Sequence, residues 1–201
     1  MVARLTHPNI ITIYDIGAEG DLLYIAMEYV PCGDLRQRLN KGPLPWLDAV
    51  RVLRPLAQAL HFAHQQQIIH RDIKPHNILF RDDGQPVLAD FGIAKLVGSQ
   101  TLTQTGAVLG TAAYMAPEQA LGDKVDGRSD LYSLGVVFYE MLVGQRPYDA
   151  DTVPALMMQH ISAPIPRLPS AQAPAQGVLD KLLAKQPADR YLHGAELAGA
   201  L

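Results

Sequence analysis

The segment HRDIKPHN at residues 70–77 places an acid, a base and an amide close together. Asp72, Lys74 and Asn77 follow one another at steps of two and three, in what reads as a loop. A carboxylate, an ammonium group and an amide that converge on one point suit the handling of a single charged substrate. Taken singly, the same residues are also common as a capping Asp, a solvated Lys and a turn Asn.

Two further motifs follow at set distances. DFG occupies residues 90–92, thirteen residues after Asn77, and APE occupies residues 116–118 at the far end of a Thr-rich stretch. DFG alone is a tripeptide that chance supplies often, whereas the five defined positions of HRDxKxxN are far more specific. Their order matches the signature set of protein kinases. The chain therefore resembles a protein kinase, and most closely the eukaryotic-like serine/threonine kinases of bacteria.

The resemblance implies transfer of the γ-phosphoryl group of ATP, with Mg²⁺, to a protein hydroxyl. Such transfer depends on positioning and on charge neutralisation more than on covalent catalysis. Asp72 is expected to accept or orient the proton of the acceptor hydroxyl, and Lys74 to meet the γ-phosphate. Asn77 and Asp90 are expected to supply oxygens for Mg²⁺. The remaining nucleotide contacts implied by the resemblance are Met27, Glu28, Val30 and Leu79, the last beneath the adenine.

The resemblance also suggests the kind of acceptor and a form of regulation. Lys74, together with Thr111 in GTAAYMAPE, suggests serine/threonine specificity, with the Thr111 hydroxyl bridging Asp72 and Lys74. The acceptor is then a protein carrying Ser or Thr. Arg71 precedes the catalytic Asp, and in the family such an arginine often pairs with a phosphate on the activation loop.

The Thr-rich stretch TLTQTG at residues 101–106 supplies candidates for that phosphate. Thr103 and Thr105 are favoured, through phosphorylation by the chain itself or in trans. A phosphothreonine adds about −1.5 to −2 charge and would order the loop against Arg71. The alternative is that both are solvated loop threonines.

The elements that must position these residues begin with two short strands. NIITIYDIG (9–17) and LLYIAMEYV (22–30), joined by AEGD, predict an antiparallel hairpin. Asp34 is a plausible N-cap for a short helix ending at Leu39. A longer helix begins near Trp46 and contains Pro55, which would remove one backbone hydrogen bond or kink it. The apolar residues at helical spacing along it are Leu47, Val50, Leu53, Leu56, Leu60 and Ala63.

The second half of the chain reads as mainly helical. Residues 78–80 and 87–90 predict two brief strands joined by a turn, and residues 91–114 predict a long loop. Residues 126–143 predict a buried helix, because most of its faces are apolar. Residues 164–174 hold four prolines and read as irregular, and two modest helices follow near 176–185 and 194–201.

Together these elements predict an α+β, protein-kinase-like fold. Residues 1–30 match part of the small β-rich N-lobe, with the end of one helix and two strands. Residues 31–34 match the hinge, and residues 35–201 match the mainly helical C-lobe. Within that lobe we expect the catalytic loop at 68–77 and the activation segment at 90–118.

Other residues resemble structural positions of the family. Glu118 and Arg190 resemble a buried ion pair, and Asp130 resembles the aspartate that holds the catalytic-loop backbone. A stacked hydrophobic spine is expected from His70, Phe91, Ile13 and Val2. No metal site is expected at His61, His64, His76 or His160, because their spacing forms no ligand set with Asp, Glu or Cys. His61 and His64 are expected on a helix surface.

The sequence also departs from the family pattern. It contains no G-x-G-x-x-G motif, and the lysine and glutamate that accompany this motif in kinases have no match. We therefore expect a kinase catalytic region truncated in its N-lobe, with an unpaired, aggregation-prone edge at the strand over 22–28. A non-catalytic, pseudokinase-like scaffold is one alternative. A small-molecule phosphotransferase of the aminoglycoside-kinase type is another, although it would not be expected to show KPHN, the threonine loop or APE.

Composition and charge narrow the kinds of partner and the cellular location that we expect. The formal net charge is −3 with scattered Lys and Arg, so no basic surface for nucleic acid is expected. Cys32 is the single cysteine, which excludes an internal disulfide and suits a reducing compartment, so a cytoplasmic location is expected. We predict neither a signal peptide nor a membrane segment in these residues, although a longer parent protein could be anchored elsewhere.

Overall fold

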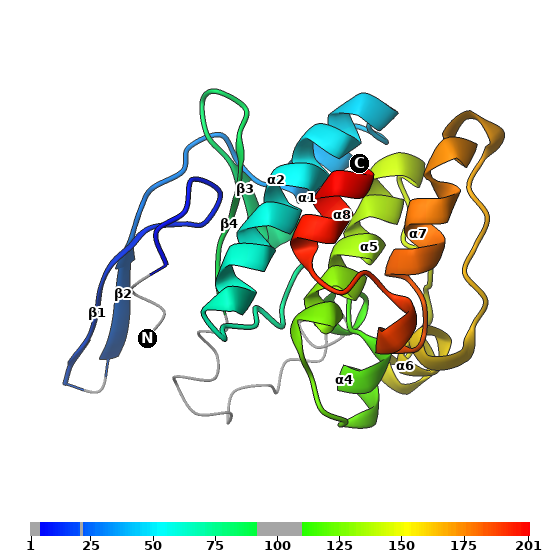
Figure 1. The fold of residues 1–201 in the computed structure, drawn as a ribbon. Helices are drawn as coiled ribbons and strands as arrows, with labels where there is room; N and C mark the ends of the chain where they lie inside the picture. The colour runs from blue at the N-terminus through cyan, green and yellow to red at the C-terminus, as the bar shows by residue number, and fades with distance from the viewer. Residues whose placement is uncertain (1–4, 21, 92–109) are drawn as a thin grey trace.

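The computed structural model describes residues 5–20, 22–91 and 110–201. A two-stranded hairpin lies at one end of the molecule, a second small hairpin follows, and packed helices form the rest (Figure 1). The strands are β1 (Ile13–Glu19), β2 (Leu22–Met27), β3 (Ile78–Phe80) and β4 (Pro86–Leu88). The α-helices are α1 (Leu35–Leu39), α2 (Trp46–Gln65), α4 (Pro117–Leu121), α5 (Gly127–Val143), α6 (Val153–Ser162), α7 (Gln176–Leu182) and α8 (Gly194–Ala200), with 3-10 turns at Pro75–Asn77, Ser170–Ala175 and Pro187–Asp189. This architecture confirms the predicted α+β class.

The first hairpin is antiparallel as predicted, with Ile16 opposite Ile25 in the register of β1 and β2. Its first strand begins later than expected, because residues 9–11 pair with β4 instead. The backbone N–H of Ile11 donates to the Leu88 carbonyl at 2.9 Å, and the N–H of Leu88 donates to the Asn9 carbonyl at 2.9 Å. This pairing ties the start of the described chain to the strand that precedes Asp90.

The first two helices begin close to the predicted residues. The Asp34 side chain accepts a hydrogen bond from the Gln37 backbone N–H at 2.8 Å, which confirms the predicted N-cap of α1. Helix α2 runs for 20 residues and continues through Pro55, so the helix is not broken there. Leu47 departs from the predicted apolar face, since it is 64% exposed in the first turn of α2.

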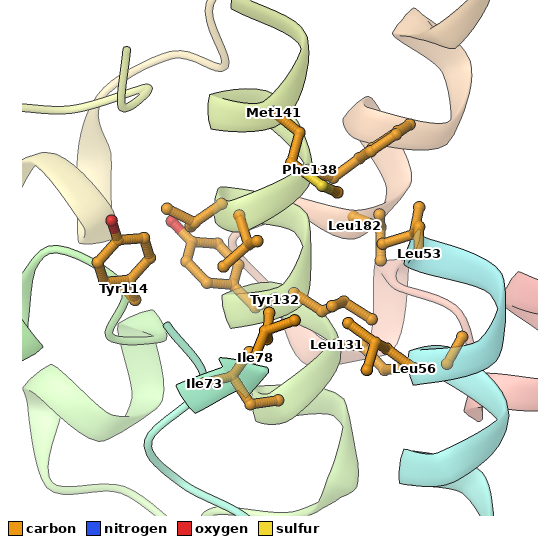
Figure 2. Packing of buried hydrophobic residues seen from close by; sticks show 14 of the residues in the cluster. Leu53, Leu56, Ile73, Ile78, Tyr114, Leu131, Tyr132, Phe138, Met141 and Leu182 are labelled. Carbon is orange, nitrogen blue, oxygen red and sulfur yellow. The ribbon is translucent and has the colours of Figure 1, made fainter. Parts of the chain in front are cut away.

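Helix α5 forms the centre of the core. Every residue from Ser129 to Leu142 is buried, as expected for a helix that neighbours surround on all sides. Helices α2 and α7 pack against α5, and α8 packs against α2. Figure 2 shows how leucines of α2, large apolar residues of α5 and Leu182 of α7 meet, beside Ile73 and Ile78 from the catalytic-loop region. The predicted buried helix at 126–143 is confirmed, and Ile73 of the predicted catalytic loop belongs to the same buried cluster.

Two helices were not expected from the sequence. Helix α4 is only five residues long, which is too short for a clear period. Helix α6 carries a local start signal, because the Thr152 side chain accepts from the Ala155 backbone N–H and Pro154 lies in its first turn. Helix α7 ends at Leu182, three residues before the predicted end.

No helix within the described ranges combines the length and the hydropathy that crossing a membrane requires.

Candidate active site

The backbone of the predicted catalytic loop is held by one buried carboxylate. Asp130, on the first turn of α5, accepts the backbone N–H of His70 and that of Arg71, each at 2.8 Å. Asp130 is buried, and the fixed loop keeps Arg71 in the left-handed region at φ 69°. Non-glycine residues adopt such a backbone at a cost, and they cluster at functional sites. The expected role of Asp130 as an anchor of the loop is confirmed.

The expectation for His64 is wrong. Its Nε2 lies 2.7 Å from the Asp130 carboxylate, and only 13% of its side chain is exposed. A position on α2 that faces α5 explains this, because the contact between the two helices brings His64 to Asp130. His64 therefore completes the hydrogen bonding of the anchor carboxylate. His61 is partly buried against His193, with ring centroids 4.9 Å apart.

His70 connects the loop to the residues before Asp90. Its Nε2 lies 2.9 Å from the Ala89 carbonyl, and its Nδ1 accepts the Asp72 backbone N–H at 3.3 Å. Because the backbone N–H can only donate, Nδ1 is the acceptor and Nε2 carries the proton. Burial lowers the pKa of His70, which favours this neutral form. The His70 ring packs on Phe91 with ring centroids 4.5 Å apart, as expected for two members of the predicted hydrophobic spine. Membership of Ile13 stays a prediction, and Val2 lies outside the described residues.

The side chains of Lys74 and Asn77 converge on the Asp72 carboxylate. Lys74 Nζ donates to Asp72 Oδ2 at 2.7 Å and to Thr111 Oγ1 at 3.3 Å. Asn77 Nδ2 donates to the Asp72 carbonyl at 2.8 Å and to Asp72 Oδ2 at 3.1 Å. Lys74 thus makes the link between Asp72 and the segment at Thr111. The structure describes the Lys74 half of the bridge that we predicted for the Thr111 hydroxyl.

Asn77 and Asp90 offer oxygen ligands that suit a magnesium ion. The Asn77 amide uses its nitrogen toward Asp72, which leaves its oxygen as the atom that can bind a cation. Asp90 follows β4, is exposed and has φ 62°. Within the described ranges, no three His, Cys, Asp or Glu side chains group as a metal cage. Mg²⁺ commonly takes one or two protein oxygens and fills its other positions with phosphate and water, so these two residues fit it.

Two of the predicted adenine contacts, Val30 and Leu79, belong to a small apolar cluster. Val30 and Leu79 pack against the buried residues Ile11, Val87 and Ala89. Met27, at the end of β2, is 37% exposed. A flat apolar base placed on this cluster would cover surface that is otherwise open to water.

The Glu28 side chain has a partner that the sequence did not indicate. Arg81 binds it through two nitrogens, at 2.8 and 2.9 Å, and also contacts the Pro8 carbonyl. The hydrogen bond from Arg81 is the main reason that the pKa of Glu28 lies below its usual value. The Glu28 carboxylate therefore ties the end of β2 to the residue after β3. Its backbone N–H donates to the Thr12 carbonyl at 2.8 Å, so its own carbonyl is the group that remains for a nucleotide.

The predicted buried ion pair is confirmed. Arg190 Nη1 and Nη2 donate to the two Glu118 carboxylate oxygens at 2.7 and 2.8 Å, and Ser129 Oγ donates at 2.5 Å. Burial by itself raises the pKa of Glu118, but the hydrogen bonds from Arg190 and Ser129 outweigh it and bring this pKa below the usual value. The pair joins α4 to the segment that leads into α8.

A second buried carboxylate was missed as a site residue. Glu140 of α5 accepts from Arg36 Nη2 at 2.8 Å and from Tyr114 Oη at 2.7 Å. Arg36 also donates to Tyr114 Oη at 2.7 Å, so the three side chains form a closed triangle. A charged residue inside an otherwise apolar run was the available signal, because a buried charge needs a partner.

The residues predicted to be regulatory are only partly described. Arg71 is placed by the Asp130 contacts, and its carbonyl accepts from Gln119 Nε2 at 3.3 Å. Thr103 and Thr105 lie outside the described residues. The pairing predicted between Arg71 and a loop phosphate therefore stays a prediction.

Comparison with known proteins places this geometry in a family. Residues 1–196 match the family described as protein kinase domain. The chain is 41% identical over 194 residues to serine/threonine-protein kinase PrkC of Bacillus subtilis, covering 94% of this chain and 30% of PrkC. It is 45% identical over 212 residues to PknB of Mycobacterium tuberculosis, covering 99% of this chain and 34% of PknB.

A third relative gives the same picture. PknL of Mycobacterium tuberculosis is 42% identical over 198 residues, covering 94% of this chain and 49% of PknL. The chain thus spans about a third to a half of the length of the curated relatives it matches. The names of all three relatives describe serine/threonine-protein kinases, in agreement with the resemblance found from the motifs. The chain belongs to the protein kinase domain family, in its bacterial, eukaryotic-like serine/threonine branch.

Proposed function

We propose that this chain is the catalytic region of a serine/threonine protein kinase, which transfers the γ-phosphoryl group of ATP to Ser or Thr hydroxyls of protein substrates. The observation that carries the proposal is the convergence of Lys74 and Asn77 on the Asp72 carboxylate, at 2.7 and 3.1 Å. In the proposed division of the chain, residues 1–30 belong to the small lobe, 31–34 to the hinge and 35–201 to the large lobe.

In this mechanism Asp72 receives or orients the proton of the acceptor hydroxyl. The Lys74 and Asn77 hydrogen bonds hold the carboxylate in place, so little orientation is lost when the hydroxyl arrives. Lys74 faces the charge that develops on the transferred group. Asn77 and Asp90 would hold Mg²⁺, which neutralises phosphate charge when bound. Val30, Leu79 and Met27 would contact the adenine, together with the backbone at Glu28.

The proposed regulation is phosphorylation of Thr103 and Thr105, by the chain itself or in trans, with Arg71 as the partner of the phosphate. We expect Thr103→Ala combined with Thr105→Ala to remove most phosphate from the purified chain after incubation with Mg·ATP. Peptide mapping by mass spectrometry measures this. A phosphate level equal to that of the unsubstituted chain would place the modified residues elsewhere.

The proposed setting is the cytoplasm. Cys32, the single cysteine, is exposed, and a free thiol is typical of a reducing compartment.

The test of the proposed function is intact mass spectrometry on phosphatase-treated chain incubated with Mg·ATP and a Ser/Thr peptide. Asp90→Asn and Asp72→Asn are the matched controls, because both residues are at least partly exposed and neither is in the core. We expect phosphate on the unsubstituted chain or on the peptide, reduced at least 100-fold by Asp72→Asn. Absence of phosphate on both, from a folded chain, would contradict the kinase proposal for these residues and would favour a binding module.

A further inference from the structure

A pocket on the described surface opens beside the proposed acceptor site. It has a volume of about 590 Å³, and Lys74 and Thr111 form part of its wall. Lys74 also contacts Asp72, where the acceptor hydroxyl must lie under the proposed function. Because neighbouring residues of an extended peptide are 3.8 Å apart, the side chain of a residue close to the acceptor reaches this pocket.

The charged groups of this pocket are unequally available. Glu140 is the one carboxylate among its lining residues, and its side chain is 4% exposed. Both Glu140 oxygens are already bonded, one to Arg36 and the other to Tyr114. Glu140 therefore presents little negative charge to a ligand, because the Arg36 cation and the Tyr114 hydroxyl already bind its two oxygens.

The arginine side chains that line the pocket are more available to a ligand than the Glu140 carboxylate. Arg146 lines the same pocket and pairs with Asp149 at 2.7 Å, but the Asp149 side chain is 74% exposed. Pairs of this exposed kind contribute little and exchange partners easily. The Arg36 guanidinium, with its five N–H donors, uses one nitrogen for both Glu140 and Tyr114 and is 27% exposed. The lining thus offers arginine donors and a masked carboxylate.

We propose that this pocket binds the side chain of a residue close to the acceptor Ser or Thr, and that Arg36 makes the pocket select an acidic side chain over a basic one. This inference deepens the proposed kinase function and rests on it for the identity of the ligand. Without Arg36 the Glu140 carboxylate would face the pocket and favour a basic side chain. Arg36 is thus a specificity-determining residue, and the substrate class is acidic Ser/Thr segments.

The test measures peptide binding without turnover. Three fluorescent peptides carry Ala in place of the acceptor, with Glu, Gln or Arg at the flanking positions, and anisotropy reports their dissociation constants. The formal net charge of −3 favours the Arg peptide in general, so a preference for Glu has to arise locally. We expect the Glu peptide to bind about tenfold more tightly than the Arg peptide, which corresponds to ~1.4 kcal/mol.

Substitutions at the triangle separate the proposal from general electrostatics. Arg36→Gln should reverse the order of the Glu and Arg peptides, and Arg36→Lys should keep it. Combining Arg36→Gln with Glu140→Gln should abolish the reversal. If Arg36→Gln fails to fold, Glu140→Gln alone serves, because freeing Arg36 should tighten binding of the Glu peptide several-fold while the Gln peptide changes little.

Three outcomes would overturn the proposal. The first is that the Glu peptide shows no saturable binding. The second is that the Arg peptide binds the unsubstituted chain as tightly as the Glu peptide or more tightly. The third is that a folded Arg36→Gln variant still binds the Glu peptide more tightly than the Arg peptide. These readouts need no ATP. A chain that discriminates the peptides but transfers no phosphate would therefore contradict the proposed function alone, and a chain that transfers phosphate without discrimination would contradict this inference alone.

Discussion

At the scale of single residues, buried charges decide how the active-site segment is held. Arg190 and Glu118 are both almost completely buried, with side-chain exposures of 0% and 6%. The Arg190 guanidinium also donates to the carbonyls of Ala184 and Lys185. Removing one member of such a pair leaves an uncompensated charge, which costs far more than the intact pair contributes.

The first prediction follows from this asymmetry. We expect Arg190→Met to lower the free energy of unfolding by about 3–5 kcal/mol, because Glu118 is left buried without its cation. Adding Glu118→Leu to Arg190→Met should recover part of that loss, since the remaining charge is then removed. Urea unfolding of the two single variants and the double variant measures the coupling. Additive effects of the two substitutions would mean that the pair is not an energetic unit.

The second prediction concerns pH. The pKa of Glu118 is lower in the folded chain than its usual value of about 4.3. The unfolded chain therefore binds the proton first as pH falls, and the stabilising contribution of Glu118 is present above about pH 4.3 and is lost below it. Glu118→Gln should be less stable than the unsubstituted chain at pH 7, and the difference should shrink toward pH 3. A difference that stays constant across this range would contradict the assignment.

At the scale of elements, close packing of helices positions the proposed catalytic loop. Helix α2 supplies His64 to the anchor carboxylate and is itself held by α5 on one side and α8 on another. The contact with α8 depends on Gly194, the first residue of that helix. A Cβ atom added there would lie 2.0 Å from the Ala57 carbonyl oxygen, a distance that requires the backbone of one helix to move.

The third prediction uses this contact. We expect Gly194→Ala to lower the free energy of unfolding by about 1–3 kcal/mol, because overpacking forces α8 away from α2. Gly199→Ala, in the same helix, is the matched control, since a Cβ there meets nothing within 4 Å. It should be neutral or should stabilise by up to about 1 kcal/mol, because Ala favours helix more than Gly. Equal effects of the two substitutions would show that the close approach is not limiting.

At the scale of the whole molecule, the hairpin at one end is exposed. Strand β2 pairs with β1 on one side and, in the ranges that the structure describes, with no strand on the other. Its sequence LLYIAM carries no charge, and Leu22, Tyr24 and Met27 are 75%, 44% and 37% exposed. An uncharged, apolar edge strand is a template for pairing with another chain.

The fourth prediction is therefore self-association. We expect the apparent mass of the isolated chain in light scattering to rise with protein concentration, and Leu22→Lys with Met27→Lys to reduce that rise, because charges on an edge strand oppose pairing. Leu192→Lys is the matched control, since Leu192 is 70% exposed but lies far along the chain beside α8. A concentration-independent monomer mass for the unsubstituted chain would contradict the prediction.

The family and much of the local structure were readable in the sequence, because both depend on short-range patterns. The motif from His70 to Asn77, the Asp34 cap and the apolar run of α5 are each encoded within about twenty residues. The short helices α4 and α6 were not predicted, since the apolar periodicity of five to ten residues is too short to distinguish a helix from a loop.

For partners that the family motifs do not indicate, the tertiary structure alone decided which distant residues meet. His64 reaches Asp130 across 66 residues, Arg81 reaches Glu28 across 53, and Arg36 reaches Glu140 across 104. No spacing rule links residues so far apart, because the meeting of two such residues depends on how the helices and strands that carry them pack. The sequence by itself determined which groups could act on a phosphate, and the packing of the helices decided which charges are paired and which remain for a substrate.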